Sequence, residues 1–304
     1  MLMKSHKAIV LSLMLILMLL LAACGSNSDK SPDTESNSSS VSLAADTADS
    51  TKDDVSDTPA AEQQPDPANQ SKPLVELTVS AAASLTDALK ELEMNYEQQN
   101  PNIELTFNFG ASGALQKQIE QGAPADLFLS ASPKNMNALV DQSLIEADHH
   151  ADLLANKLVA VVPADSSAAI DAMDDLGPKD LYRIAIGIPE SVPAGQYAQE
   201  ALTKANLWGT LKSDIVQGKD VRQVLQYVET GNADVGFVYK TDALSSTKSK
   251  VAFEVDPASY SPIVYPAGVV ASTKHAEEAE ALYTYLQTDE AIAIFEKYGF
   301  SVPN

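Results

Sequence analysis

Strand-like segments alternate with helix-like segments along the chain from residue 74 to residue 304. Val75, Leu77 and Val79 alternate with polar residues, which indicates a half-buried strand, and residues 84–99 carry leucines at helical spacing. This alternation predicts an α/β fold whose sheets are covered on both faces. Further strands are expected at 104–109, 126–130, 157–162, 183–188, 233–239 and 262–271, and further helices at 133–142, 193–205, 220–229, 277–287 and 289–298, with one more helix ending near 121.

This part of the chain is long enough for one large domain or for two small domains that share a core. Several of its side chains are expected to serve the fold alone. Asp87, three residues after Ser84, fits an acidic variant of the capping box at the start of the first helix. Trp208, Tyr283 and Tyr285 are expected to be packing residues.

The first residues have the pattern of a secretory signal peptide. Two lysines precede an apolar run at residues 8–20, which is shorter than the about 20 residues that a membrane-spanning helix needs. Residues 21–25, LAACG, resemble a bacterial lipobox, in which the cysteine becomes the lipidated first residue of the mature protein. We therefore expect a signal peptide at 1–23 and lipidation at Cys24. The alternative is an ordinary signal peptide with an incidental cysteine.

Residues 24–73 are expected to form a lipid-anchored, disordered, acidic tether. The stretch is rich in Ser, Asp, Thr, Pro and Ala, lacks a hydrophobic period, and carries ten acidic residues against three lysines. Such a composition buries too little apolar area to offset the entropy of ordering. The lipid anchor and the tether predict an exported protein on the outer face of the cytoplasmic membrane, and they suggest a Gram-positive host.

The chain is strongly acidic, with 20 Lys+Arg against 42 Asp+Glu and a net charge of -22. This balance argues against nucleic-acid binding, because phosphate contacts need clustered Lys and Arg. At first sight it also argues against an anionic ligand. With one Cys and four His, the chain has no cluster for structural zinc and cannot close an internal disulfide. His149 and His150 lie in a polar stretch and are expected to be exposed on a loop.

In four places a strand or turn runs into a predicted helix through small or hydroxyl residues, at 82–86, 110–113, 192–195 and 219–222. The first N–H groups of a helix lack partners within the helix and carry a partial positive charge, so they can hold an anion without Lys or Arg. Each place alone also fits an ordinary N-cap or an N1 proline. Together they favour a ligand cleft, because ligands of α/β folds lie beyond the carboxyl ends of the strands. Arg222 is expected to make a surface ion pair.

Seven segments carry a more specific pattern. They are AAASLTDA at 81–88, FGASGAL at 109–115, QIEQGAPADLF at 118–128, PESVPAG at 189–195, DVR at 220–222, GFVY at 236–239 and IFEKYGF at 294–300. Their combination and order closely resemble the molybdate-binding proteins of ABC importers. The resemblance implies a two-lobed periplasmic-binding-protein-like α/β fold of type II, with the ligand cleft between the lobes. Lobe 1 would span about 74–158 and 244–304, and lobe 2 about 159–243.

The resemblance also implies the ligand contacts, because this family holds a tetrahedral oxyanion with hydroxyls and backbone amides. The matching positions imply hydroxyl and amide donation from Ser84 and Ser112, N–H donation from Ala194 and Val221, and a phenolic O–H from Tyr239. The molybdenum would be held only through its oxygens, with no side chain bound to the metal and no cofactor. The implied partners are molybdate or tungstate, an ABC permease and its ATPase. The protein would be a monomer and not an enzyme.

Two other functions stay open at this point. One is a receptor for sulfate or another oxyanion, since sulfate is also a dianion and only the size of the cavity would exclude it. The other is a serine hydrolase with Ser112 as the nucleophile. The motif at 110–113 lacks the G-x-S-x-G spacing, however, and no His sits in a comparable turn.

Overall fold

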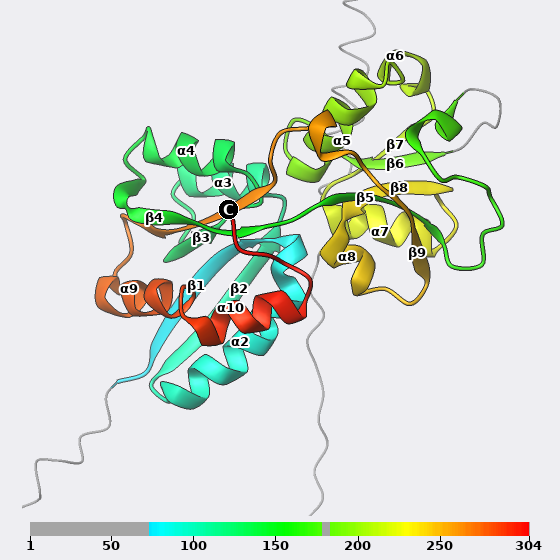
Figure 1. The fold of residues 1–304 in the computed structure, drawn as a ribbon. Helices are drawn as coiled ribbons and strands as arrows, with labels where there is room; N and C mark the ends of the chain where they lie inside the picture. Colours follow the sequence, from blue (N-terminus) through cyan, green and yellow to red (C-terminus); the bar gives the residue numbers. More distant parts are fainter. Residues whose placement is uncertain (1–72, 178–182, 304) are drawn as a thin grey trace, which may run out of the picture. The chain divides into compact units, whose positions relative to one another are not determined.

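The computed structural model describes residues 73–177 and 183–303. The expected signal peptide, Cys24 and the tether lie outside the described residues. Within the described ranges, none of the helices has the length and apolar character needed to cross a membrane. The described strands form two five-stranded sheets, which are accompanied by helices (Figure 1).

The first sheet has the strand order β2-β1-β3-β10-β4. β1, β2 and β3 run parallel, and β10 pairs antiparallel with β3 and β4. We call this sheet with its helices lobe 1. Its elements are β1 (Val75–Ala82), the 3-10 turn η2 (Ala83–Leu85), α2 (Thr86–Gln99), β2 (Ile103–Gly110), α3 (Ser112–Glu120), β3 (Leu127–Leu129), α4 (Pro133–Val140), β4 (Ile145–Ala155), β10 (Val264–Val270), α9 (Ala276–Tyr285) and α10 (Asp289–Lys297).

The second sheet has the strand order β7-β6-β8-β5-β9. β6 runs parallel to β7 and β8, and β5 pairs antiparallel with β8 and β9. We call this sheet with its helices lobe 2. Its elements are β5 (Leu158–Pro163), η3 (Met173–Leu176), β6 (Ile184–Gly187), α5 (Pro193–Lys204), α6 (Trp208–Leu211), β7 (Ile215–Gly218), α7 (Val221–Glu229), β8 (Val235–Tyr239), α8 (Lys240–Leu244) and β9 (Ser249–Glu254); η4 (Pro257–Ser259) follows β9.

Over the residues that the structure describes, the chain passes between the two sheets twice, once between β4 and β5 and once between β9 and β10. The second passage differs from the expectation, which ended lobe 2 near residue 243. β9 pairs with β5, so the passage lies after Glu254. The reason is that β9 follows a polar stretch and lies at the edge of its sheet, where a strand needs little hydrophobic signal.

His149 and His150 lie in β4, not on the loop that was expected, and both are half-buried. β4 is an edge strand of the first sheet, and its middle residues are largely polar. An edge strand tolerates such polar residues because only one of its sides is paired. His149 Nδ1 lies 3.6 Å from a carboxylate oxygen of Glu280 on α9. The three packing residues expected from the sequence are confirmed, because Tyr283 is buried and both Trp208 and Tyr285 pack partly buried against the core.

Two glycines bring the start of α5 against β6. Pro193 is the first residue of α5, and Gly195 follows it within the first turn. A Cβ atom on Gly195 would collide with the carbonyl oxygen of Gly187, the last residue of β6. This close approach places the first N–H groups of α5 directly beyond the carboxyl end of a parallel strand.

We predict that Gly195→Ala destabilises the protein. The added methyl must push α5 away from β6, and overpacking of this kind costs about 1–3 kcal/mol in the free energy of unfolding. Gly209→Ala is the matched control, because Gly209 is exposed and its Cβ would meet no atom within 4 Å. Urea unfolding of both variants measures the effect. Equal stability of the two variants would show that the approach of α5 to β6 is not tight.

Candidate functional site

One pocket is lined by all five residues that the sequence assigned to ligand binding. Ser84 lies in η2 after β1, and Ser112 begins α3 after β2. Ala194 lies in the first turn of α5, Val221 begins α7, and Tyr239 ends β8. The exposed fraction of each is 4% or less. The pocket therefore lies between the carboxyl ends of strands of both lobes. Its other lining residues are Ala82, Ala83, Gly110, Ala111, Ala131, Val192 and Pro193.

Two of the hydroxyl groups that line this pocket, those of Ser112 and Tyr239, can donate to a ligand. Ser112 Oγ accepts a hydrogen bond of 2.9 Å from the N–H of Ala131, which leaves the hydroxyl proton of Ser112 for another acceptor. The Tyr239 hydroxyl is buried, and no hydrogen-bond partner among the described residues lies within 3.5 Å of it. Burial raises the pKa of Tyr239 well above its usual value, so this hydroxyl keeps its proton at neutral pH. An unpaired buried hydroxyl costs about 1–3 kcal/mol, which a bound acceptor would recover.

Backbone N–H groups complete the set. Ala194 and Val221 lie in the first turns of α5 and α7, where N–H groups have no acceptor within their own helix. The N-cap side chain of α7, Asp220, accepts from the N–H of Gln223 at 2.8 Å and not from that of Val221. Among the described residues, none that lines the pocket carries a charged side chain. The pocket thus offers neutral donors and the partial positive charge of helix starts.

The two lobes are in contact around this pocket. The N–H of Gly113 in lobe 1 donates to the carbonyl oxygen of Ser191 in lobe 2 at 3.0 Å. The hydroxyl of Tyr197 in lobe 2 donates to the carbonyl oxygen of Ala131 in lobe 1 at 3.4 Å. The cavity that remains between the two lobes is small.

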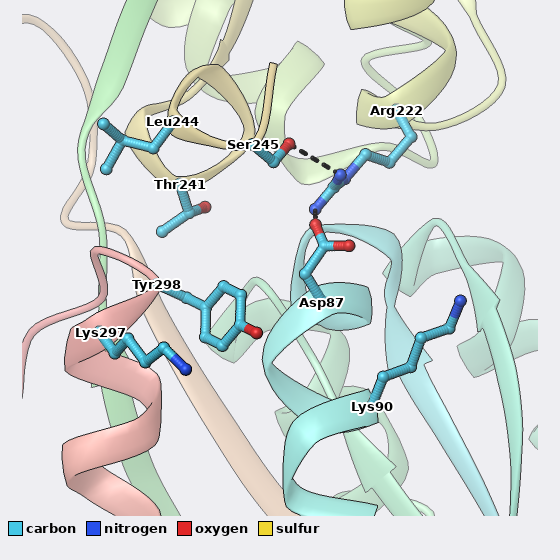
Figure 2. A pocket seen from close by; sticks show the side chains of 8 residues that line it. All are labelled: Asp87, Lys90, Arg222, Thr241, Leu244, Ser245, Lys297 and Tyr298. Carbon is cyan, nitrogen blue, oxygen red and sulfur yellow. Dashed lines mark hydrogen bonds and ion pairs between the residues drawn. The ribbon is translucent and has the colours of Figure 1, made fainter. Parts of the chain in front are cut away.

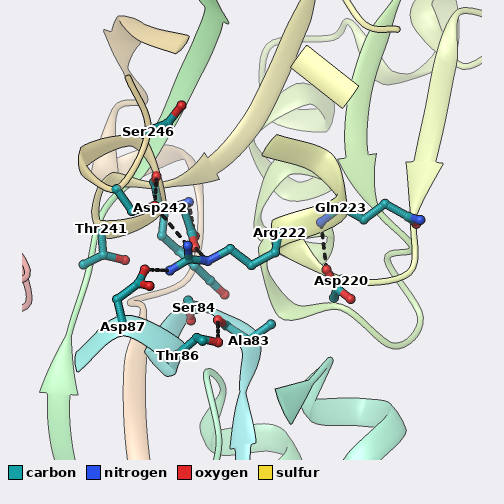
Figure 3. A network of polar contacts seen from close by, with 12 residues as sticks. Ala83, Ser84, Thr86, Asp87, Asp220, Arg222, Gln223, Thr241, Asp242 and Ser246 are labelled. Carbon is teal, nitrogen blue, oxygen red and sulfur yellow. Dashed lines mark hydrogen bonds and ion pairs between the residues drawn. The ribbon is translucent and has the colours of Figure 1, made fainter. Parts of the chain in front are cut away.

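Arg222 on α7 forms an ion pair across the lobes, as Figure 3 shows. Its Nη2 atom lies 2.6 Å from Asp87 on α2, and its Nε atom lies 2.8 Å from Asp242 on α8. The expected ion pair is present, but it is not a simple surface pair, because only 26% of the Arg222 side chain is exposed. The role expected for Asp87 was wrong, since no side chain caps α2 and α2 begins at Thr86. Asp87 binds Arg222 instead.

A second pocket, of about 480 Å³, lies beside this ion pair (Figure 2). It draws Asp87 and Lys90 from α2, Arg222 from α7, and Lys297 from α10. In contrast to the pocket between the strand ends, it is lined by charged side chains of both signs. The other lining residues are Thr241, Leu244, Ser245 and Tyr298.

Asp242 and Asp87 were not recognised from the sequence as groups near the pocket. The fully buried carboxylate of Asp242 accepts a hydrogen bond from the N–H of Tyr239 at 3.3 Å. The signal that could have found it is its place three residues after Tyr239, at the start of α8, which is the spacing of a capping box. Asp87 gave no such signal, because its partner Arg222 is 135 residues away.

A two-lobed α/β fold with a donor-lined pocket between the lobes defines a solute-binding protein. Residues 77–301 match the family model described as "Bacterial extracellular solute-binding protein", and the chain belongs to this family. It is 52% identical to the putative ABC transporter substrate-binding lipoprotein YvgL of Bacillus subtilis over 227 aligned residues. The aligned residues cover 75% of this chain and 86% of that protein.

Two further relatives carry names that mention molybdate or molybdenum. The molybdate-binding protein ModA of Haemophilus influenzae is 42% identical over 231 residues, which cover 74% of this chain and 89% of that protein. A solved structure, the substrate-binding domain of a putative molybdenum ABC transporter from Clostridium difficile, matches with a TM-score of 0.58 and 44% identity over 75% of this chain and 99% of that one. The resemblance found in the sequence is confirmed, as is the two-lobed fold.

We predict that Asp242 makes stability depend on pH in a defined direction. Burial, only partly offset by Arg222, raises the pKa of Asp242 to about 6 in the folded protein, against about 4 in the unfolded chain. A raised pKa stabilises the fold below pH 4, and this contribution is lost as the pH rises through 6. The free energy of unfolding of the wild type, minus that of Asp242→Asn, should fall by about 2 kcal/mol between pH 4 and pH 7.

Asp234→Asn serves as a control of opposite sign. Partial burial raises the pKa of Asp234, but hydrogen bonds from Arg183 outweigh it, so the net shift is a lowering. The stability that Asp234 contributes is therefore lost as the pH falls. Urea unfolding at several pH values measures both differences. A difference for Asp242→Asn that rises with pH, as for Asp234→Asn, would contradict the assignment.

Proposed function

We propose that this protein binds molybdate, and also tungstate, outside the cell and delivers the oxyanion to the permease and ATPase of an ABC importer. The observation that carries the proposal is the set of converging neutral donors, above all the buried hydroxyl of Tyr239 that lacks a partner. The names of the relatives support molybdate over other oxyanions. In this proposal Ser84, Ser112, Ala194, Val221 and Tyr239 hold the oxygens, and no side chain touches the molybdenum.

A pocket of donors selects for an anion that carries no proton. Molybdate and tungstate are dianions at neutral pH, whereas a protonated phosphate would bring a hydrogen that finds no acceptor, at a cost of about 1–3 kcal/mol. Hydrogen bonds to a charged partner contribute about 1.5–3 kcal/mol each. Before the costs of ordering and desolvation, several of them exceed the about 8 kcal/mol that corresponds to micromolar binding. Sulfate, also a dianion, has to be rejected by size.

The proposed cycle couples binding to movement of the lobes. Ser84 and Ser112 belong to lobe 1, while Ala194, Val221 and Tyr239 belong to lobe 2. A ligand that contacts both sets stabilises the closed arrangement only, so binding shifts the population of lobes toward closure. Gly113 and Ser191 then meet directly, as do Arg222 and Asp87. The closed monomer is the form that we propose the permease recognises.

The hydrolase alternative is weakened by the surroundings of Ser112. A serine nucleophile needs a base within hydrogen-bond reach. No His lines the pocket of the described chain, and the hydrogen bond found at Ser112 Oγ comes from the backbone N–H of Ala131. We propose that the protein has no enzymatic activity, and ester hydrolysis that disappears in Ser112→Ala would overturn this part.

We further propose that the mature protein is anchored by lipid on Cys24 on the outer face of the cytoplasmic membrane of a Gram-positive cell, with residues 24–73 as a tether. The lipobox pattern at 21–25 and the name of the Bacillus subtilis relative, a lipoprotein, support this. Acyl chains contribute about 0.8 kcal/mol per buried CH₂, and two or more chains give stable anchoring.

A thermal-shift titration tests the ligand. The mature chain carrying Cys24→Ala should gain about 2.7 kcal/mol of stability at a molybdate concentration 100 times the Kd, and tungstate should act in the same way. Sulfate and phosphate should give little shift at the same concentration. Ser112→Ala should bind molybdate roughly 10- to 100-fold more weakly, because it loses a hydrogen bond to a charged ligand. A shift with sulfate but not with molybdate would favour the sulfate receptor.

Membrane fractionation tests the anchor. The full-length protein expressed in a Gram-positive cell should sediment with the membranes, and Cys24→Ala should appear in the soluble fraction or the medium, because the acyl chains are missing. Cys24→Ala should bind molybdate as tightly as the wild type. Membrane association of Cys24→Ala equal to that of the wild type would contradict the proposed lipid anchor at Cys24.

A further inference from the structure

Ser84 differs from Ser112 in how its hydroxyl is held. Ser112 Oγ accepts a hydrogen bond from the backbone N–H of Ala131, so the Ser112 hydroxyl proton is available to another acceptor. Ser84 Oγ lies 2.9 Å from the hydroxyl of Tyr265, a residue of β10 that is 1% exposed. Either hydroxyl of this pair can donate to the other. Only if Tyr265 donates can Ser84 turn its own proton toward the pocket.

The side chain of Asn156 determines which of the two hydroxyls, Ser84 or Tyr265, donates in the hydrogen bond between them. The N–H of Lys157 donates to Asn156 Oδ1 at 2.8 Å, and a backbone N–H can only donate. This contact fixes the amide so that Nδ2 faces the other way. Nδ2 donates to Thr241 Oγ1 at 3.0 Å and to Tyr265 Oη at 3.4 Å. The oxygen of Tyr265 is thus an acceptor from Asn156.

Tyr265 has one proton to give, and Ser84 Oγ is the one acceptor among the described residues within 3.5 Å of its oxygen. Burial raises the pKa of Tyr265 well above its usual value, so the hydroxyl remains protonated. Because its oxygen accepts from Asn156, its proton goes to Ser84 Oγ. We infer that Asn156 and Tyr265 are positioning residues that turn the Ser84 proton into the pocket, through a chain of hydrogen bonds from Lys157 N–H to Asn156, Tyr265, Ser84 and the oxyanion. This inference rests on the proposed function of Ser84 as a ligand donor.

The chain of hydrogen bonds begins where the polypeptide passes between the lobes. Asn156 lies between the end of β4 and the start of β5, and its N–H donates to Ile263 O, just before β10, at 3.2 Å. Thr241, the other partner of its amide, belongs to α8 of lobe 2. The direction of the Ser84 hydroxyl is therefore set at the passage itself. A Ser84 held as a donor disfavours a protonated oxyanion, which would need an acceptor there.

A double-mutant cycle tests the inference. Tyr265→Phe keeps the ring and removes the hydroxyl, so Ser84 is no longer held as a donor, and molybdate binding measured by isothermal titration should weaken about 10-fold. In a Ser84→Ala background the same Tyr265→Phe change should alter the Kd less than about 2-fold, because Tyr265 acts through Ser84. Tyr283→Phe, a buried tyrosine on α9 that does not line the pocket, is the control and should bind as the wild type.

Asn156→Asp gives a second, independent variant. The carboxylate still accepts from Lys157 N–H but cannot donate to Tyr265, so it draws the Tyr265 proton away from Ser84. Binding should again weaken about 10-fold, to which the added negative charge contributes because salt screens a partly buried charge little. In a Tyr265→Phe background, Asn156→Asp should weaken molybdate binding only about 2-fold further, since residue 265 then has no hydroxyl for Asn156 to orient.

The outcomes separate this inference from the proposed function. If the wild type binds no oxyanion, the proposed function fails, and the inference fails with it. If the wild type binds molybdate but Tyr265→Phe and Asn156→Asp bind it equally well, the inference alone is overturned. It is also overturned if Tyr265→Phe weakens binding as much without the Ser84 hydroxyl as with it. Should Tyr265→Phe not fold, unchanged binding by Asn156→Asp decides against the inference.

Discussion

In the proposed function the pocket between the two lobes would have to hold the oxyanion with neutral donors, because none of the described residues that line it is charged. Neutral donors are effective only when they converge and when water is excluded, since each contributes little in water. Convergence comes from the fold: η2, α3, α5 and α7 each start close to the carboxyl end of a strand. The close contact of Gly195 with Gly187 and the buried hydroxyls serve the same requirement.

The sequence predicts the parts of the molecule that depend on local pattern. The strand and helix of residues 75–99 follow from apolar spacing, and the junctions at 110–113 and 192–195 follow from small residues before a helix. β4, β7 and β9 were missed because they lie at the edges of their sheets and carry little hydrophobic pattern. Edge strands are defined by the neighbour with which they pair, and that neighbour is distant in sequence.

The polar contacts around the pocket were missed for a related reason. Ser84 and Tyr265 are 181 residues apart, and Asp87 and Arg222 are 135 residues apart. No local pattern distinguishes a serine that is bonded to a buried tyrosine from one that caps a helix. The net charge of -22 argued against an anionic ligand, but it counts groups that lie away from the pocket. It bears on how fast an anion approaches the protein, and this rate should increase with salt.

Both ends of the described chain belong to lobe 1. β1 is the first strand of its sheet in the sequence, and Ser301 near the C-terminus bonds to Ala155 at the end of β4. Lobe 2 is thus an insertion: within the described residues its backbone joins lobe 1 through the two passages, and its other contacts with lobe 1 are non-covalent. A pull on either end of the described chain therefore acts on lobe 1 first and does not act directly on lobe 2.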